Sequence, residues 1–343
     1  MRPPAPSEHD PFHERPARLQ RRGLHLLGAL FRFESNSSRL LRLVEHAFAG
    51  LPRHDLWPRS PQLHVRLLLT RDAGRPGGRA PPRLQTAAGP GFVCGTIDAA
   101  NFSVICPAQR SALVCVSPTL LRHPYHARYE LIEFAVYVLA ARAQGLVPLH
   151  AAAVGRHGRG LLLVGDSGAG KSTLALHCLL QGLQILSEDA VFVRPRGLEA
   201  TGVANFLHLL PAGLSLVQPH PSVARIRAAP LIQRRSGAEK HELDLRHAGW
   251  QLAAAPLPIR SVVFLSKQPA GKHKLLLPLT AHECRRRLAG HQPYARGQPG
   301  WAVFLRNLAP VRAYELRRGP HPSVAAARLR ELLDAPARGA RRA

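Results

Sequence analysis

The stretch GLLLVGDSGAGKSTLALHCLL, residues 160–180, decides the fold. An apolar run of the length of a buried strand (160–165) leads into a glycine-rich loop. An apolar segment with helical character follows, Leu174–Gln181. The loop reads GDSGAGKS over residues 165–172 and matches the pattern G-x-x-x-x-G-K-[ST] in full. Because strand, loop and helix follow one another directly, the sequence predicts a phosphate-binding P-loop in an α/β fold.

Each residue type of this loop suits a bound nucleotide. Glycines let the backbone curl so that its N–H groups face phosphate oxygens, and the following helix presents its positive end to the same anion. Lys171 supplies a charge for the terminal phosphates, and Ser172 supplies an oxygen for Mg²⁺. We therefore predict ATP and Mg²⁺ as the bound species. The predicted nucleotide-binding residues are Gly165, Asp166, Ser167, Gly168, Ala169, Gly170, Lys171, Ser172 and Thr173.

Three polar residues flank the loop in sequence and are candidates for the chemistry. Glu188 and Asp189 interrupt two apolar runs 17 and 18 residues after Lys171, which favours a pocket over a solvated turn. Carboxylates placed there can hold Mg²⁺ and accept a proton from an attacking hydroxyl. His150 lies 15 residues before the loop, and a hairpin would bring it to the phosphate end of the site. A core histidine is the alternative interpretation of His150.

Residues 149–191, LHAAAVGRHGRGLLLVGDSGAGKSTLALHCLLQGLQILSEDAV, resemble the catalytic domain of the HPr kinase/phosphorylase family. That family is related to ATP-dependent phosphoenolpyruvate carboxykinase through the same loop architecture. The resemblance implies an α/β fold with a P-loop kinase domain of the HPr-kinase/carboxykinase type. The strand-like and helix-like runs before this domain predict a smaller mixed α/β N-terminal module, which does not resemble the usual N-terminal domain of the family. The implied activity is an ATP-dependent serine kinase that transfers the γ-phosphoryl group to a seryl hydroxyl.

The resemblance also implies roles for individual residues. Lys171 and His150 line the phosphate site and count among the catalytic residues, with Glu188 and Asp189. The acidic pair supplies the base and a contact to metal, so Ser172 and Asp189 are the predicted Mg²⁺ ligands. The family usually has Asp–Asp at this pair, and the longer Glu188 arm leaves open that Asp189 shares or takes over the base role. A segment linked to the reverse phosphorylase reaction is missing, so the sequence predicts a forward-only kinase.

Composition and charge divide the chain and bound its partners. The 343 residues favour about two domains. We predict a disordered tail at 1–22, an N-terminal α/β module of unknown role at 23–145, the kinase domain at 146–334 and a second tail at 335–343. The formal charge of +26 is dispersed, which makes nucleic acid an improbable partner and suits an acidic protein or peptide acceptor. The resemblance to the HPr kinase/phosphorylase family is also compatible with a homo-oligomer of this protein.

Cysteine usage and hydropathy point to the cytoplasm. The five cysteines have wide spacings and form no CxxC pair, which is typical of reduced thiols rather than disulfides or a zinc site. The first 22 residues contain no apolar stretch like that of a signal peptide, and nowhere do 18 apolar residues follow one another. We therefore predict a cytoplasmic protein without a membrane span.

Two further functions compete with a kinase acting on protein or peptide. The first is a kinase for a small metabolite, and the second is a nucleotide-dependent regulatory binding protein. One segment outside the matching stretch bears on the site: EKHELDLR, residues 239–246, alternates as a strand does. A solvated edge strand is one interpretation of this segment. In the other, Lys240 or Arg246 neutralises phosphoryl charge.

Overall fold

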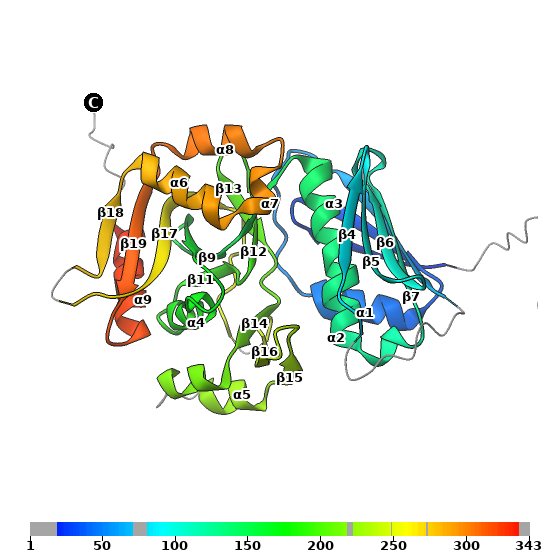
Figure 1. Cartoon of the computed structure of the whole chain (residues 1–343), viewed down its shortest axis with the longest axis horizontal. Coiled ribbons are helices and arrows are strands. Elements are labelled where there is room, and N and C mark those ends of the chain that lie inside the picture. Colours follow the sequence, from blue (N-terminus) through cyan, green and yellow to red (C-terminus); the bar gives the residue numbers. More distant parts are fainter. Residues whose placement is uncertain (1–18, 71–80, 218–221, 248, 272–273, 336–343) are drawn as a thin grey trace, which may run out of the picture.

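The computed structural model describes residues 19–70, 81–217, 222–247, 249–271 and 274–335. These residues form a mixed α/β structure with three sheets (Figure 1). The strands of one sheet all precede residue 117, and the strands of the other two all follow residue 146. We call residues 19–146 the N-terminal unit and residues 147–335 the C-terminal unit. The predicted tails fall mostly outside the described residues, but strand β1 begins at Gln20, so the tail predicted to reach residue 22 was too long.

The N-terminal unit is a seven-stranded sheet with strand order β1-β2-β3-β7-β6-β5-β4. Strands β2, β3 and β7 are parallel neighbours, and the other pairs are antiparallel. The first two strands form a hairpin, because the chain turns at Leu27 and Gly28, which both have positive φ. The strands are β1 (Gln20–Leu26), β2 (Ala29–Ser35), β3 (Gln62–Leu69), β4 (Gln85–Gly89), β5 (Phe92–Asp98), β6 (Asn101–Cys106) and β7 (Ser111–Val116).

Helices of this unit lie on the face of the sheet that is turned toward the C-terminal unit (Figure 1). Helix α1 (Ser38–Phe48) buries one apolar stripe against the sheet, as its spacing predicts. The chain from residue 124 to residue 144 is helical in three consecutive segments: α2 (Pro124–His126), π-helical turns at Ala127–Glu133 and α3 (Phe134–Gln144). Wide π turns often occur at functional sites, and here they carry buried charged residues.

The main sheet of the C-terminal unit has nine strands, with the order β11-β9-β10-β17-β13-β12-β8, and β19 and β18 beyond β17. Strand β10 is parallel to β17, and β17 is parallel to β19. The strands are β8 (Val147–His150), β9 (Ala152–Arg156), β10 (Arg159–Val164), β11 (Gln184–Ser187), β12 (Ala190–Arg194), β13 (Glu199–Gly202), β17 (Leu257–Pro269), β18 (Leu276–Leu279) and β19 (Arg312–Arg318).

Strand β10 is apolar from Leu161 to Val164 because both faces of this sheet are covered. Leu161 and Leu163 pack on one face, against helices α4 and α9, whereas Leu162 and Val164 pack on the other, beneath α6 and α8 (Figure 1). The four residues are at most 1% exposed. The helices of this unit are α4 (Lys171–Leu180), α5 (Ser222–Ala228), α6 (Ala281–His291), α7 (Pro293–Arg296), α8 (Trp301–Leu308) and α9 (Pro322–Asp334).

A small third sheet of the C-terminal unit has the order β14-β16-β15. Its strands are β14 (Phe206–Leu209), β15 (Leu231–Gln233) and β16 (Glu239–Asp244). Strand β16 pairs on both sides, so the interpretation of residues 239–246 as a solvated edge strand was wrong. The sheet carries His208 and Glu242 into the contact with the N-terminal unit.

Candidate active site

The glycine-rich loop joins the end of β10 to the start of α4, in the strand–loop–helix order that the sequence predicts. Gly168 has φ 78° and Gly170 has φ 96°, a region of backbone space that side chains disfavour. Gly170 is also the N-cap of α4 and has no side chain to occupy the first N–H groups of the helix. Those groups are therefore available to an anion at the positive end of α4.

Lys171 is a buried cation folded back over this loop. Its Nζ donates to the carbonyl oxygen of Gly165 at 2.7 Å, and the residue is 7% exposed. Burial lowers the pKa of Lys171, although the carboxylates of Asp189 and Glu188 act in the opposite direction. The loop is also tied down from outside, because His291 of α6 pairs with Asp166 at 3.0 Å.

Glu188 lies directly against the start of α4. The hydroxyl of Ser172 donates to one carboxylate oxygen of Glu188, which places the two predicted residues together. Glu188 follows the last residue of β11 in a tight turn, which the hydroxyl of Ser187 closes by donating to the carbonyl oxygen of Ala190 at 2.7 Å. Glu188 is 6% exposed, so its carboxylate depends on protein partners.

Asp189 points to a different partner. Its Oδ1 lies 2.9 Å from Nε2 of His150, because β8 and β12 are paired with His150 opposite Ala190. Gln292 holds the main chain of His150 on both sides: it accepts from the His150 N–H at 2.7 Å and donates to its carbonyl oxygen at 3.0 Å. Burial alone would raise the pKa of Asp189, but the hydrogen bond and charge of His150, with Arg234 and Lys171, lower it to about 2. Asp189 is therefore a carboxylate at neutral pH.

The predicted hairpin does not include His150. The hairpin is formed by β9 and β10, and His150 ends the preceding strand β8, at the opposite end of the strand order from β11. His150 still reaches the site because the chain passes directly from β8 to β9 through Ala151, whose N–H donates to the carbonyl oxygen of Asp189 at 3.1 Å. The interpretation of His150 as a core residue does not hold, since its side chain is 51% exposed.

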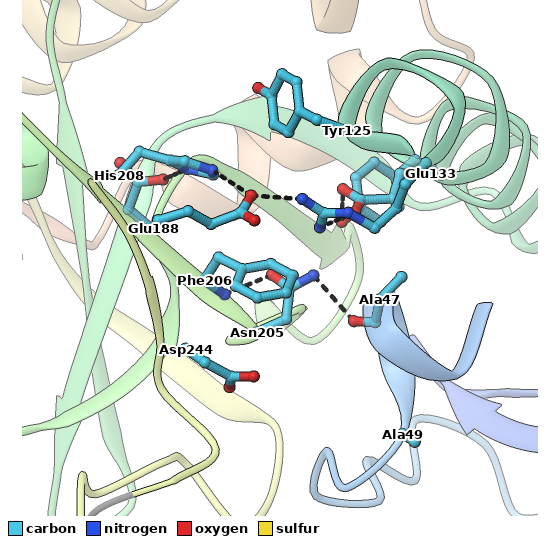
Figure 2. Close-up of polar contacts among 12 residues, drawn as sticks. Ala47, Ala49, Tyr125, Glu133, Glu188, Asn205, Phe206, His208 and Asp244 are labelled. Atoms are coloured by element: carbon cyan, nitrogen blue, oxygen red, sulfur yellow. Dashed lines mark hydrogen bonds and ion pairs between the residues drawn. The ribbon is translucent and has the colours of Figure 1, made fainter. Parts of the chain in front are cut away.

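Behind Glu188 lies a chain of buried charged side chains that the sequence analysis missed (Figure 2). Nδ1 of His208 lies 3.2 Å from Glu188, and Nε2 of His208 lies 3.2 Å from Glu242. Arg128 of the N-terminal unit donates to Glu242 and, at 2.8 Å, to Glu133. The hydrogen bonds with both carboxylates raise the pKa of His208, against the effect of its burial.

A second missed residue, Arg234, lies beside Asp189. Its Nη2 is 3.8 Å from Oδ2 of Asp189, and its Nη1 donates to the Tyr125 hydroxyl at 2.7 Å. The guanidinium lies 4.8 Å from the ring centroid of Tyr129, within cation–π distance. Both tyrosines belong to the N-terminal unit, which therefore shapes the site from across the interface.

The two cations considered in residues 239–246 differ in their surroundings. Lys240 is close enough for its charge to add to the effect of burial on the pKa of Lys171. Arg246 is instead committed elsewhere, because its guanidinium donates to Asp244 at 2.6 Å and to the carbonyl oxygen of Ala49 at 2.9 Å. Of the pair, only Lys240 is a candidate for the phosphate site.

Two cavities open beside these residues. The first, of about 410 Å³, is lined by Gly168, Gly170 and Thr173 of the loop and by residues at the ends of β17 and β19. The second, of about 370 Å³, has His150 and Asp189 in its wall and is otherwise largely apolar. Both volumes fall within the range of small-ligand pockets.

Metal ligands are sparse in the described part of the chain. No group of three or more His, Cys, Asp or Glu side chains there has the arrangement of a metal site. A Mg²⁺ ion beside bound phosphates needs only one or two protein oxygens, which Ser172 and Glu188 offer side by side.

Among the described helices, none combines the length and hydropathy needed to cross a bilayer. All five cysteines are free thiols.

Comparison with known proteins gives one sequence match of note. The chain is 41% identical over 61 residues to the HPr kinase/phosphorylase of Mycoplasmopsis pulmonis, a match that spans 18% of this chain and 20% of that protein. A solved structure titled as the Hpr(Ser) kinase/phosphatase of Coxiella burnetii aligns with 54% of this chain and 95% of its own, at 12% identity and a TM-score of 0.26. No family model matches the chain. The sequence match confirms the predicted similarity to HPr kinase/phosphorylases.

Proposed function

We propose that this protein is an ATP-dependent kinase that transfers the γ-phosphoryl group to a serine hydroxyl of a protein or peptide. One observation carries the proposal: a glycine-rich loop with a buried lysine lies against two carboxylates that have separate partners. Glu188 contacts Ser172, and Asp189 contacts His150. This separation suits phosphoryl transfer, in which one set of groups neutralises charge on the phosphates and another accepts the proton of the attacking hydroxyl.

The nucleotide half of the site follows from the loop. The N–H groups of residues 165–172 and the start of α4 receive the phosphate oxygens, and Lys171 leaves the carbonyl oxygen of Gly165 to pair with them. The cavity of about 410 Å³ beside Gly168 and Thr173 is continuous with the loop and accommodates the nucleoside.

Ser172 and Glu188 would hold Mg²⁺, because their oxygens already meet in a buried position. When bound, the ion neutralises charge on the β- and γ-phosphates. The sequence predicts Asp189 as the metal ligand and Glu188 as the first candidate for the base. The contacts favour the reverse assignment, since it is Glu188 that touches Ser172 while Asp189 faces His150 and an open cavity.

Asp189 then accepts the proton of the attacking hydroxyl. The seryl oxygen forms the new bond to phosphorus as the bond from phosphorus to the ADP oxygen breaks, and the proton passes to the Asp189 carboxylate. His150 orients that carboxylate, and Arg234 and Lys240 lie where they can offset charge on the transferring group. The acceptor enters through the cavity of about 370 Å³.

The name of the sequence relative supports a protein acceptor, because HPr kinase/phosphorylase denotes an enzyme that acts on HPr. A small-metabolite kinase remains the second candidate, since the acceptor cavity has the size of a small-ligand pocket. We propose forward transfer only, because the segment linked to phosphorolysis in the related family has no counterpart here.

The test is incubation of the purified protein with γ-labelled ATP, Mg²⁺ and a host lysate, followed by identification of the labelled product. We expect a labelled protein that carries phosphoserine, and none with Lys171→Ala. A dialysable labelled product would replace the protein acceptor by a metabolite, and equal labelling with Lys171→Ala would refute the kinase assignment. Pyrophosphate release from purified phosphoprotein and excess phosphate would refute forward-only transfer.

A second experiment separates the two carboxylates. Asp189→Asn should lower transfer about 10²–10⁴-fold at saturating Mg²⁺, the usual loss for a general base. Glu188→Gln should be partly rescued by high Mg²⁺ or Mn²⁺. Asp334→Asn is the matched control: Asp334 is 40% exposed against 37% for Asp189 and also pairs with a histidine and an arginine, beside the β9–β10 turn. Rescue of Asp189→Asn by metal, but not of Glu188→Gln, would reverse the assignment.

A further inference from the structure

The buried charges behind Glu188 form one continuous chain that leaves the loop and ends in the N-terminal unit. In order, the chain runs through Ser172, Glu188, His208, Glu242, Arg128 and Glu133. Figure 2 shows Glu188 and His208 on one side of the interface and Glu133 on the helix of the other, joined by these contacts. Each of the five charged residues in this series, from Glu188 to Glu133, is at most 7% exposed. Water therefore contributes little to stabilising their charges.

His208 occupies the middle of this chain and uses both ring nitrogens. A carboxylate lies 3.2 Å from each nitrogen, so both nitrogens donate only when the ring is protonated. Such a ring cannot turn without breaking a hydrogen bond to a buried carboxylate, and a buried carboxylate left without its partner is strongly disfavoured. The geometry of His208 is therefore fixed from both sides.

Glu188 needs such a support because of its own flexibility. Its carboxylate sits on a side chain with three torsions, and contact with the Ser172 hydroxyl restrains only one of its two oxygens. The second oxygen is restrained by His208. A displacement of about 1 Å in a reacting group can cost about 100-fold in rate, so the second restraint has a functional consequence.

We propose that His208 is a positioning residue that holds the carboxylate of Glu188 against Ser172. Arg128 of the N-terminal unit, through Glu242, holds His208 in turn. The N-terminal unit thus contributes to the metal side of the site through these contacts. This inference rests on the proposed function, because it takes Glu188 as a ligand of the Mg²⁺ ion.

The test compares His208→Gln with His54→Gln. His54 is a matched control: it is 6% exposed, it also crosses the two units, and its ring nitrogens contact Thr201 at 2.8 Å and the carbonyl oxygen of Ala253 at 2.9 Å. Both variants should lower the temperature of thermal unfolding. Only His208→Gln should weaken Mn²⁺ binding to the ADP complex, measured by electron paramagnetic resonance, by about 10–100-fold.

The same variant should raise the Mg²⁺ concentration for half-maximal transfer and lower kcat, with little change in the KM for ATP. Glu242→Gln, which leaves His208 in place, guards against a folding defect and should move metal binding in the same direction by a smaller factor. Because the residues act in series, the double variant His208→Gln/Glu242→Gln should be no worse than His208→Gln alone.

Three outcomes separate the possible failures. If His208→Gln loses stability as His54→Gln does but binds Mn²⁺ and responds to Mg²⁺ like the wild type, the positioning role is refuted. If Glu242→Gln has no effect on metal binding while His208→Gln does, the link to Arg128 is refuted. If the wild-type protein neither binds Mn²⁺ with ADP nor consumes ATP, the proposed function fails and this inference fails with it.

Discussion

Replacing Arg128 by methionine tests whether the charge chain between the two units is also a stability element. The Arg128 side chain is 2% exposed, and it pairs with Glu133 and Glu242, whose side chains are 5% and 8% exposed. Its guanidinium also lies 4.3 Å from the ring centroid of Phe206. Methionine keeps much of the packing and removes the charge, so both carboxylates lose their shared cation.

Removal of one partner from a buried ion pair costs about 3–5 kcal/mol. Two features place this case near the lower end. Glu242 retains His208 as a partner, and burial raises the pKa of Glu133, so this carboxyl can take up a proton when Arg128 is gone. We therefore expect Arg128→Met to lower the free energy of unfolding by about 3 kcal/mol.

Urea unfolding followed by circular dichroism measures this loss. The control is Arg21→Met, because Arg21 pairs with Glu34 while 78% exposed and should lose less than about 1 kcal/mol. The double variant Arg128→Met/Glu133→Gln should lose less than Arg128→Met alone, because the amide no longer buries a charge. Equal losses for Arg128→Met and Arg21→Met, or a larger loss in the double variant, would refute the reasoning.

Three further predictions address the loop, the sheet and the interface. Ser172→Ala should raise the Mg²⁺ requirement of transfer, because one oxygen ligand is removed, and full activity in excess EDTA would contradict a metal role. Gly202→Ala should lower stability by about 1–3 kcal/mol in thermal unfolding, since the new Cβ would lie 2.6 Å from that of Ser187. Burial alone would raise the pKa of Glu130, but hydrogen bonds from His126 and Arg235 lower it. The stabilisation of the folded protein by these bonds is therefore present above about pH 4 and is lost as the pH falls further. Arg235→Gln should therefore lower the free energy of unfolding by about 1 kcal/mol at pH 7, and this difference from the wild type should shrink as the pH falls. A difference that stays constant from pH 7 to pH 3 would contradict the prediction.

The sequence was sufficient where structure depends on neighbouring residues. Strand β10, the glycine-rich loop and helix α4 follow from an apolar run, a glycine pattern and a helical segment within 21 residues, and all three elements were predicted in order. Strand β19 was not predicted, because its sequence RAYELRR has no clean alternation. That strand forms because β17 and β18 pair with it on both sides, which no local pattern reveals.

The site divides in the same way. Glu188, Asp189 and Lys171 could be found because they lie within 19 residues of one another, in a pattern with a recognised chemistry. Arg234 and His208 could not, because their importance depends on contacts with Asp189 and Glu188 that form only when the small sheet folds back over the loop. A lone arginine or histidine gives no sequence signal of such a contact.

The ion pair between Arg128 and Glu242 joins positions 114 residues apart, and this has a consequence for how the gene can diverge. A lineage that lost the arginine first would carry a buried carboxylate without its cation. Substitutions at positions 128 and 242 should therefore occur together, or both positions should stay unchanged. A homologue that keeps residues 149–191 but lacks an arginine at the position of Arg128 should therefore also lack at least one of the two carboxylates that pair with it, Glu133 and Glu242. Chimeras assembled from such homologues should express well only when both positions come from the same parent.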